Sequence, residues 1–143
     1  MPRLAVLNML IGFIVLSLIA AAGSFIATDM TEAFLNDKEI LFTWETMLLR
    51  SAHGHTNLFA VLHICFGLTM SYSTLSIRIK KLQTWGLFLG TFAMGPLMFW
   101  RAKVGPVSDV DATELLIGLF LSCALVALVS HSYGLAMKYH RHE

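Results

Sequence analysis

The sequence predicts an all-α fold, a four-helix transmembrane bundle. Hydrophobic residues make up 57% of the 143 residues and charged residues only 13%, whereas about 25% charged residues is usual for soluble domains. The charges are also segregated, and a spanning helix needs roughly 20 mostly apolar residues. Four runs without Asp, Glu, Lys or Arg meet this length, namely 4–28, 51–77, 82–100 and 115–137.

These runs occupy most of the chain, so we expect one integral membrane domain over residues 1–143 and no separate soluble domain. The first run follows Arg3 and ends near small residues, as a secretory signal does. Its apolar stretch is longer than the ~7–15 residues of a signal core, so we expect it to be retained as a helix. The expected helices are 4–28, 47–77, 82–100 and 112–137.

The charge distribution predicts the orientation. Connections 29–50 and 101–114 carry eight acidic and four basic residues, whereas the termini and the 78–81 turn carry six basic residues. Basic residues favour the cytoplasmic side. We therefore expect both termini inside and the acidic connections outside, in a bacterial inner membrane. The net charge of +1 gives no reason to expect nucleic acid as a partner.

Residues 29–45 are acidic with spaced apolar side chains. This pattern is typical of a short amphipathic helix at the outer interface, with Trp44 as an aromatic anchor. A plain connection is the alternative.

Small residues at helical spacing mark the third and fourth helices. Gly86 and Gly90 would let another helix approach closely, and Pro96 removes a backbone hydrogen bond and predicts a kink. On the fourth helix a small column either seats a neighbouring helix or leaves room for a flat ligand. The column consists of Ala124, Ala127, His131 and Gly134.

Three histidines lie in the second helix. His53 and His55 point roughly 160° apart on a helix, so they cannot chelate one metal ion unless the chain unwinds at Gly54. His55 and His63 lie about 12 Å apart along the axis, too far to bind one ion together. A single zinc or copper site is therefore disfavoured.

A polar side chain in lipid has a partner or a function. His53 could be an interfacial hydrogen-bonding group near Arg50 and Asn57. His55 is equally suited to ligate haem or to bond to another helix. His63, near the bilayer centre, requires a partner on another helix or a cofactor.

The run Arg50-Ser-Ala-His-Gly-His-Thr-Asn-Leu resembles the second helix of haem–copper oxidase catalytic subunits, particularly the nitric oxide reductase branch. The resemblance covers about 20 residues and implies that His55 is an axial ligand of haem b. The binuclear-centre histidines of that family have no counterpart here, so oxygen or nitric oxide reduction is not implied. Met98 or a histidine of another protomer would supply the second ligand.

The candidate iron ligands are therefore His55, His63 and His131, with Met98 as a further one. Arg50 would pair with a haem propionate, and Phe59 and Trp100 would pack on the macrocycle. The remaining candidate cofactor-binding residues are His53 and Asn57.

The same run also resembles the second helix of the membrane glutathione-transferase and eicosanoid family, whose members are four-helix proteins of this length. That family has a glutamate where this chain has Phe59 and Ala60, and it places this helix end in the cytoplasm.

Three functions remain open. The first is a small haem b electron-transfer protein or respiratory subunit with quinol or protein partners, in a homo- or hetero-oligomer. The second is a cofactor-free membrane interaction subunit, and the third is a glutathione-transferase-like trimer. A metal-handling role for the eight methionines is a weaker alternative, because methionine commonly fills gaps between helices. Whether any reaction is catalysed stays open.

Overall fold

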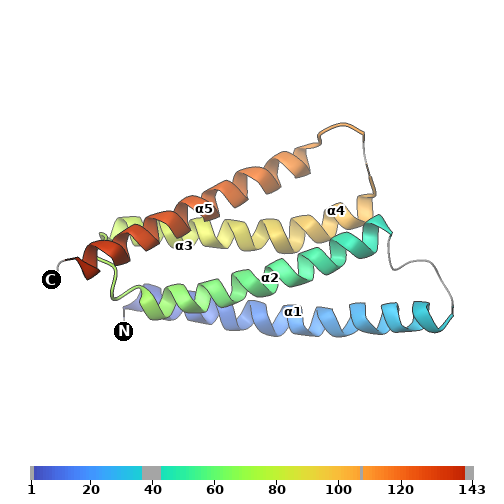
Figure 1. Cartoon of the computed structure of the whole chain (residues 1–143), viewed down its shortest axis with the longest axis horizontal. Coiled ribbons are helices and arrows are strands. Elements are labelled where there is room, and N and C mark those ends of the chain that lie inside the picture. The colour runs from blue at the N-terminus through green and yellow to red at the C-terminus, as the bar shows by residue number, and fades with distance from the viewer. Residues whose placement is uncertain (1, 37–42, 107, 141–143) are drawn as a thin grey trace.

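The computed structural model describes residues 2–36, 43–106 and 108–140, which are helical apart from short turns and contain no strand. The long helices lie side by side as an elongated bundle (Figure 1). Helices α3, η1 and α4 follow one another without a break and form one rod. The elements are α1 (Arg3–Leu35), α2 (Trp44–Thr69), α3 (Ile77–Phe92), the π-helical turn η1 (Ala93–Leu97), α4 (Met98–Val104) and α5 (Ala112–Tyr139).

Polar side chains define where three of the helices begin. Thr43, Ser76 and Asp111 precede α2, α3 and α5, and each side chain accepts a hydrogen bond from the backbone N–H three residues later. The first N–H groups of a helix have no partner within it, so such caps stabilise the start by about 1 kcal/mol.

The predicted amphipathic helix over 29–45 is not a separate element. Helix α1 continues to Leu35 and includes the acidic residues 29–35, while residues 37–42 lie outside the described part of the chain. Residues Trp44 and Glu45 already belong to α2. Trp44, the expected aromatic anchor, packs beneath the guanidinium of Arg101, which lies 4.9 Å from the indole centroid.

The turn between α2 and α3 also differs from the prediction. Helix α2 ends at Thr69, earlier than the expected 77, and α3 begins at Ile77, earlier than the expected 82. Ser76 caps α3, and its uncharged neighbours kept this turn inside a charge-free run. A boundary drawn from charge alone therefore fell several residues too late.

Glycines bring the helices into close contact. A Cβ atom at Gly86 would lie 2.8 Å from the carbonyl oxygen of Cys123, and one at Gly90 would lie 2.5 Å from the Cβ of Ala124. Gly12 and Gly67 make equivalent contacts between α1 and α2. The predicted close approach of α3 to its neighbour is confirmed.

The small column of α5 seats other parts of the chain. Its four members are the buried residues of this helix, and they face α2, α3 and the α2–α3 turn. Pro96 lies within η1, so the expected irregularity is a π-helical turn, which accommodates the missing N–H of proline.

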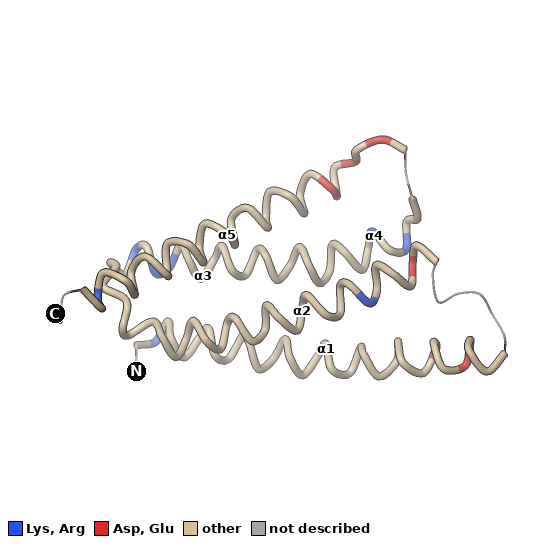
Figure 2. The backbone as a smooth tube through the Cα atoms, viewed as in Figure 1, with Lys and Arg blue, Asp and Glu red and all other residues tan. Residues whose placement is uncertain are grey.

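Helices α1 and α5 are long and apolar enough to cross a membrane, judged over the described residues. Their apolar side chains remain largely exposed; Leu18 and Val126, for example, are each 68% exposed. The two termini lie at one end of the bundle (Figure 1). Charged residues cluster at its two ends, and the central part carries none (Figure 2).

The glycine contacts predict opposite effects of two alanine substitutions. Gly90→Ala would drive a methyl group into Ala124 and Phe59, so we expect a loss of about 1–3 kcal/mol of stability. Gly118→Ala meets no atom within 4 Å and should stabilise α5 by roughly 0.5–1 kcal/mol. Thermal unfolding in detergent, followed by circular dichroism, measures both. Equal midpoints for the two variants would contradict the packing described above.

Candidate functional site

His63 lies at the centre of the bundle and is completely buried. Its Nδ1 lies 3.1 Å from the Asn8 Oδ1 atom on α1, and its Nε2 lies 3.2 Å from the Thr91 hydroxyl on α3. The Asn8 amide nitrogen in turn donates to the Thr84 hydroxyl at 2.9 Å. One chain of hydrogen bonds therefore joins α1, α2 and α3, and of the two expected kinds of partner for His63 the structure provides the one on other helices.

The proton positions in this network follow from its acceptors. Because Asn8 Oδ1 can only accept, Nδ1 of His63 carries a proton and donates it. The one hydrogen of the Thr91 hydroxyl then has two acceptors within reach, Nε2 of the neutral ring at 3.2 Å and the Leu87 carbonyl oxygen at 3.0 Å. Both ring nitrogens are thus used within the chain, and His63 has no free atom to offer an iron ion.

His131 of α5 is 5% exposed and stacks on Phe66, with ring centroids 4.1 Å apart. Its Nε2 lies 2.9 Å from the Thr69 hydroxyl, which also donates to the Cys65 carbonyl. Because that hydroxyl has one hydrogen, Nε2 carries the ring proton and donates to it. Nδ1 is buried without a partner among the described residues. Phe66 covers one face of the His131 ring, beside which the small column of α5 could have left room for a flat ligand.

His53 and Asn57 are brought together one turn apart on α2. The Asn57 amide nitrogen lies 3.1 Å from His53 Nε2 and donates to it. The ring fills the space left by Gly23 on α1, where a Cβ atom would lie 2.4 Å from the His53 Cε1 atom. His53 therefore packs α2 against α1.

His55 is arranged differently from the other three. Its side chain is exposed on the surface of α2. Its Nδ1 lies 2.8 Å from the Ser51 carbonyl oxygen, which can only accept, so Nδ1 carries the proton. The lone pair of Nε2 then has no partner among the described residues. Histidines that bind metals commonly hold their second nitrogen in this way, with its N–H donated to a carbonyl.

The other predicted residues do not gather around His55. Met98 packs against the core, Phe59 is buried against Gly90, and Trp100 is exposed. Arg50 is exposed, and no hydrogen bond or ion pair joins it to the described residues. The described ranges contain no cluster of three or more His, Cys, Asp or Glu side chains placed to hold a metal ion. Cys65 and Cys123 are both free thiols.

Sequence reasoning missed the role of Arg101. This residue is 3% exposed, pairs with Glu114 at 2.7 Å, and has Asp111 at 3.8 Å. It also donates to the Gly105 carbonyl. The three partners tie the end of α4 to the start of α5. The positive charge inside an acidic connection was the available signal, but charge counting treated it only as a marker of orientation.

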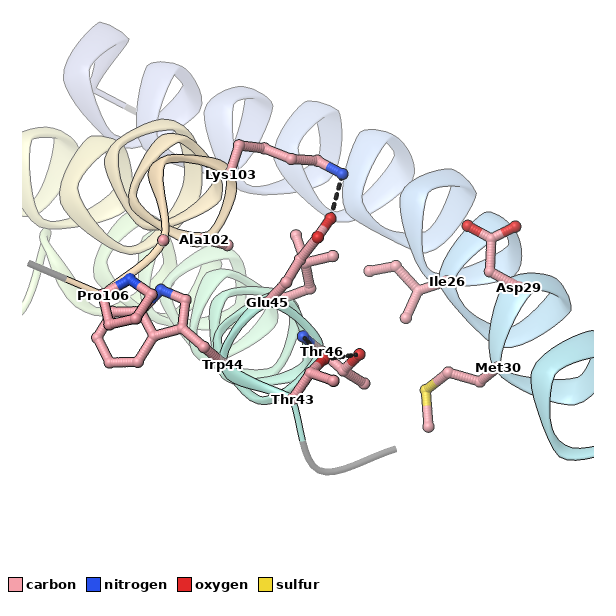
Figure 3. Close-up of a pocket in the computed structure, with 12 residues that line it drawn as sticks. Ile26, Asp29, Met30, Thr43, Trp44, Glu45, Thr46, Ala102, Lys103 and Pro106 are labelled. Atoms are coloured by element: carbon pink, nitrogen blue, oxygen red, sulfur yellow. Dashed lines mark hydrogen bonds and ion pairs between the residues drawn. The ribbon is translucent and has the colours of Figure 1, made fainter. Parts of the chain in front are cut away.

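A cavity of about 480 Å³ lies at the acidic end, where α1, α2 and α4 meet. Figure 3 shows Asp29 and Met30 on α1, with Trp44 and Glu45 on α2; Glu45 pairs with Lys103 of α4. None of the predicted site residues lines this cavity. Three elements that are distant in sequence build this cavity, so no local sequence pattern predicts it.

No protein-family model, curated protein or solved structure matches this chain.

The His63 network predicts coupled effects of two substitutions. Asn8→Leu leaves the His63 Nδ1 hydrogen unpaired and should cost about 1–3 kcal/mol. In the double variant Asn8→Leu with His63→Leu, we expect a smaller loss than the sum of the single losses, because no donor is then left unpaired. Unfolding in detergent measures the three free energies. The control is Ser17→Ala, which removes an exposed hydroxyl on the same helix; strict additivity of the pair would contradict the network.

Proposed function

We propose that this chain is an integral membrane protein with four spans, formed by α1, α2, the α3–η1–α4 rod and α5. The charge-free central part of the bundle supports this assignment (Figure 2). So do the exposed apolar side chains of α1 and α5. At 1.5 Å per residue, the 26 residues of α2 extend about 39 Å, which exceeds the roughly 30 Å hydrocarbon core of a bilayer.

The same proposal assigns both termini to the cytoplasm. Basic residues at the start of α1, at the start of α3 and at the end of α5 lie at the end of the bundle that carries the termini, and most acidic residues lie at the other end (Figure 2). Basic residues favour the cytoplasmic side. The acidic cavity of Figure 3 would then face the outside.

Within this membrane protein, His55 is the proposed axial ligand of a haem b shared with a second polypeptide chain. The observation that carries the proposal is the hydrogen bond from His55 Nδ1 to the Ser51 carbonyl, because it leaves Nε2 free on an exposed surface. His55 lies about 16 Å along α2 from its first residue. A bare nitrogen at this depth in lipid is costly, so it calls for a partner.

The surface that carries His55 is open to a second chain, because His55 is exposed on α2. Phe59, one turn further along α2, lines a separate cavity of about 330 Å³ together with residues of α5. A haem b with two axial ligands exchanges single electrons; this chain offers one ligand at that surface, and the neighbouring chain would supply the other.

Arg50 is left out of the proposed ligand set. At about 100° per residue, Arg50 and His55 point roughly 140° apart on the helix. A propionate held by Arg50 would therefore belong to a group on a different face of α2 from the iron bound by His55.

The haem proposal predicts an effect confined to one histidine. The full chain, produced with haem supplied and purified in detergent, should give an alpha band in a reduced-minus-oxidised spectrum. His55→Ala should weaken haem binding by at least about ten-fold, since even the loss of a group that orients a ligand has an effect of this size. His140→Ala is the matched control, because His140 is exposed at the end of α5. A folded, haem-supplied preparation without the band, or an unchanged His55→Ala spectrum, would refute the proposal.

A cofactor-free interaction subunit is the second candidate. It is favoured by the observation that His53, His63 and His131 all bond within the chain. These histidines would then serve helix packing, and His55 would bond to a side chain of a partner subunit.

A photo-crosslinking residue placed at Leu58 tests this second candidate. Leu58 is 53% exposed and lies close to His55 on α2, whereas Leu18 is 68% exposed on α1 and serves as the control position. Illumination of native membranes should give a discrete adduct from position 58 and none from position 18. Adducts of equal yield from both positions would indicate random collision and would count against a specific partner at this surface.

A further inference from the structure

A second apolar cavity, of about 530 Å³, lies between α3 and α5. Its lining is almost entirely apolar and includes Leu89 and Val126, with Trp85 at its edge. The close approach of the helices at Gly86 forms its floor. We call this cavity the α3–α5 groove.

One polar side chain in this groove is buried and only half satisfied. Gln83 is 2% exposed, and its amide nitrogen donates to the Ser130 hydroxyl at 2.8 Å. Its Oε1 atom is buried and has no hydrogen-bond partner among the described residues. Leaving such an acceptor without a donor costs about 1–3 kcal/mol. Gln83, which lines the groove, therefore has an acceptor that the described residues do not use.

The orientation of the Gln83 amide is fixed by its neighbours. The Ser130 hydroxyl donates to the Ala127 carbonyl at 3.0 Å and accepts from Gln83. Exchanging the oxygen and nitrogen of the amide would ask the one hydroxyl hydrogen to serve two acceptors. The free atom is therefore the oxygen, and what it needs is a donor.

The position of Gln83 along α3 indicates how a molecule bound in the groove would lie. Gln83 lies six residues from the start of α3, about 9 Å along the helix, at the end of the bundle where the basic residues of α3 lie (Figure 2). The apolar lining continues from there toward the middle of the bundle. The polar end of a bound molecule would lie near the membrane surface, and its apolar body would extend inward.

We propose that the α3–α5 groove binds a lipid-soluble molecule whose hydroxyl group donates to Gln83 Oε1. A quinol has this chemistry, with hydroxyl groups on a ring and an apolar chain, and a long-chain alcohol shares the hydroxyl. The corresponding quinone has no hydroxyl to donate. The proposal rests on the membrane placement given above and is independent of haem, because the groove and His55 lie on different helices.

The test uses the full chain in phosphatidylcholine nanodiscs, with Trp44 and Trp100 replaced by phenylalanine so that Trp85 alone reports. Fluorescence titrations with decylubiquinol, decylubiquinone and 1-decanol give three apparent affinities. Gln83→Leu should weaken decylubiquinol binding by about five-fold, the value of one hydrogen bond, and leave decylubiquinone unchanged. An equal loss for 1-decanol assigns the site to hydroxyl-bearing lipids in general; a loss for the quinol alone assigns it to quinols.

Val126→Trp is the second variant, because Val126 is 68% exposed and lines the groove. It should block all three molecules without touching the Gln83 hydrogen bond. Binding of decylubiquinol that is unaffected by either variant would overturn the groove. Equal losses of quinol and quinone in Gln83→Leu would overturn the donor chemistry. Failure of the chain to enter nanodiscs would instead remove the membrane placement on which the groove depends.

Discussion

The hydrogen-bond chain through His63 is the interaction on which the rest of the bundle depends. It joins three helices through side chains that are all buried, namely Asn8, His63, Thr84 and Thr91. An imidazole in such a place is stable only if both nitrogens are satisfied. Asn8 and Thr91 meet this requirement, and in doing so they fix how far α1 and α3 can slide along α2. The apolar contacts around them allow many registers, whereas these bonds allow one.

The helices themselves were largely predictable because their composition is extreme. Charge-free runs locate α1, the α3–η1–α4 rod and α5, and five of their six ends agree with the structure to within five residues. The errors fell where the chain turns without using charge. The turn before Ile77 is built mainly from serine, threonine and tyrosine. The start of α3 is marked by the Ser76 cap rather than by a lysine. Conversely, the segment 29–35, which contains Asp29 and Glu32, continues helix α1, although its charge predicted a change of element.

The candidate site was predictable only in part. The sequence required a partner for His63, but it could not name Asn8 or Thr91, which lie 55 and 28 residues away. The resemblance singled out His55, but the pattern of residues alone could not say which of His55 and His63 is covered by other helices. The difference arises from which face of α2 is covered by other helices. Arg101 and Gln83 escaped notice for a related reason, because their importance comes from burial by α5.

The order of helix contacts has a consequence for biosynthesis. Helix α1 packs along α2, and α3 packs along α5, through the glycine contacts. Each pair is therefore a helical hairpin that can form as soon as its second member leaves the ribosome. The bond between Thr91 and His63 is available only once α3 has been made. Until then one ring nitrogen of His63 in the first hairpin has no partner on a later helix.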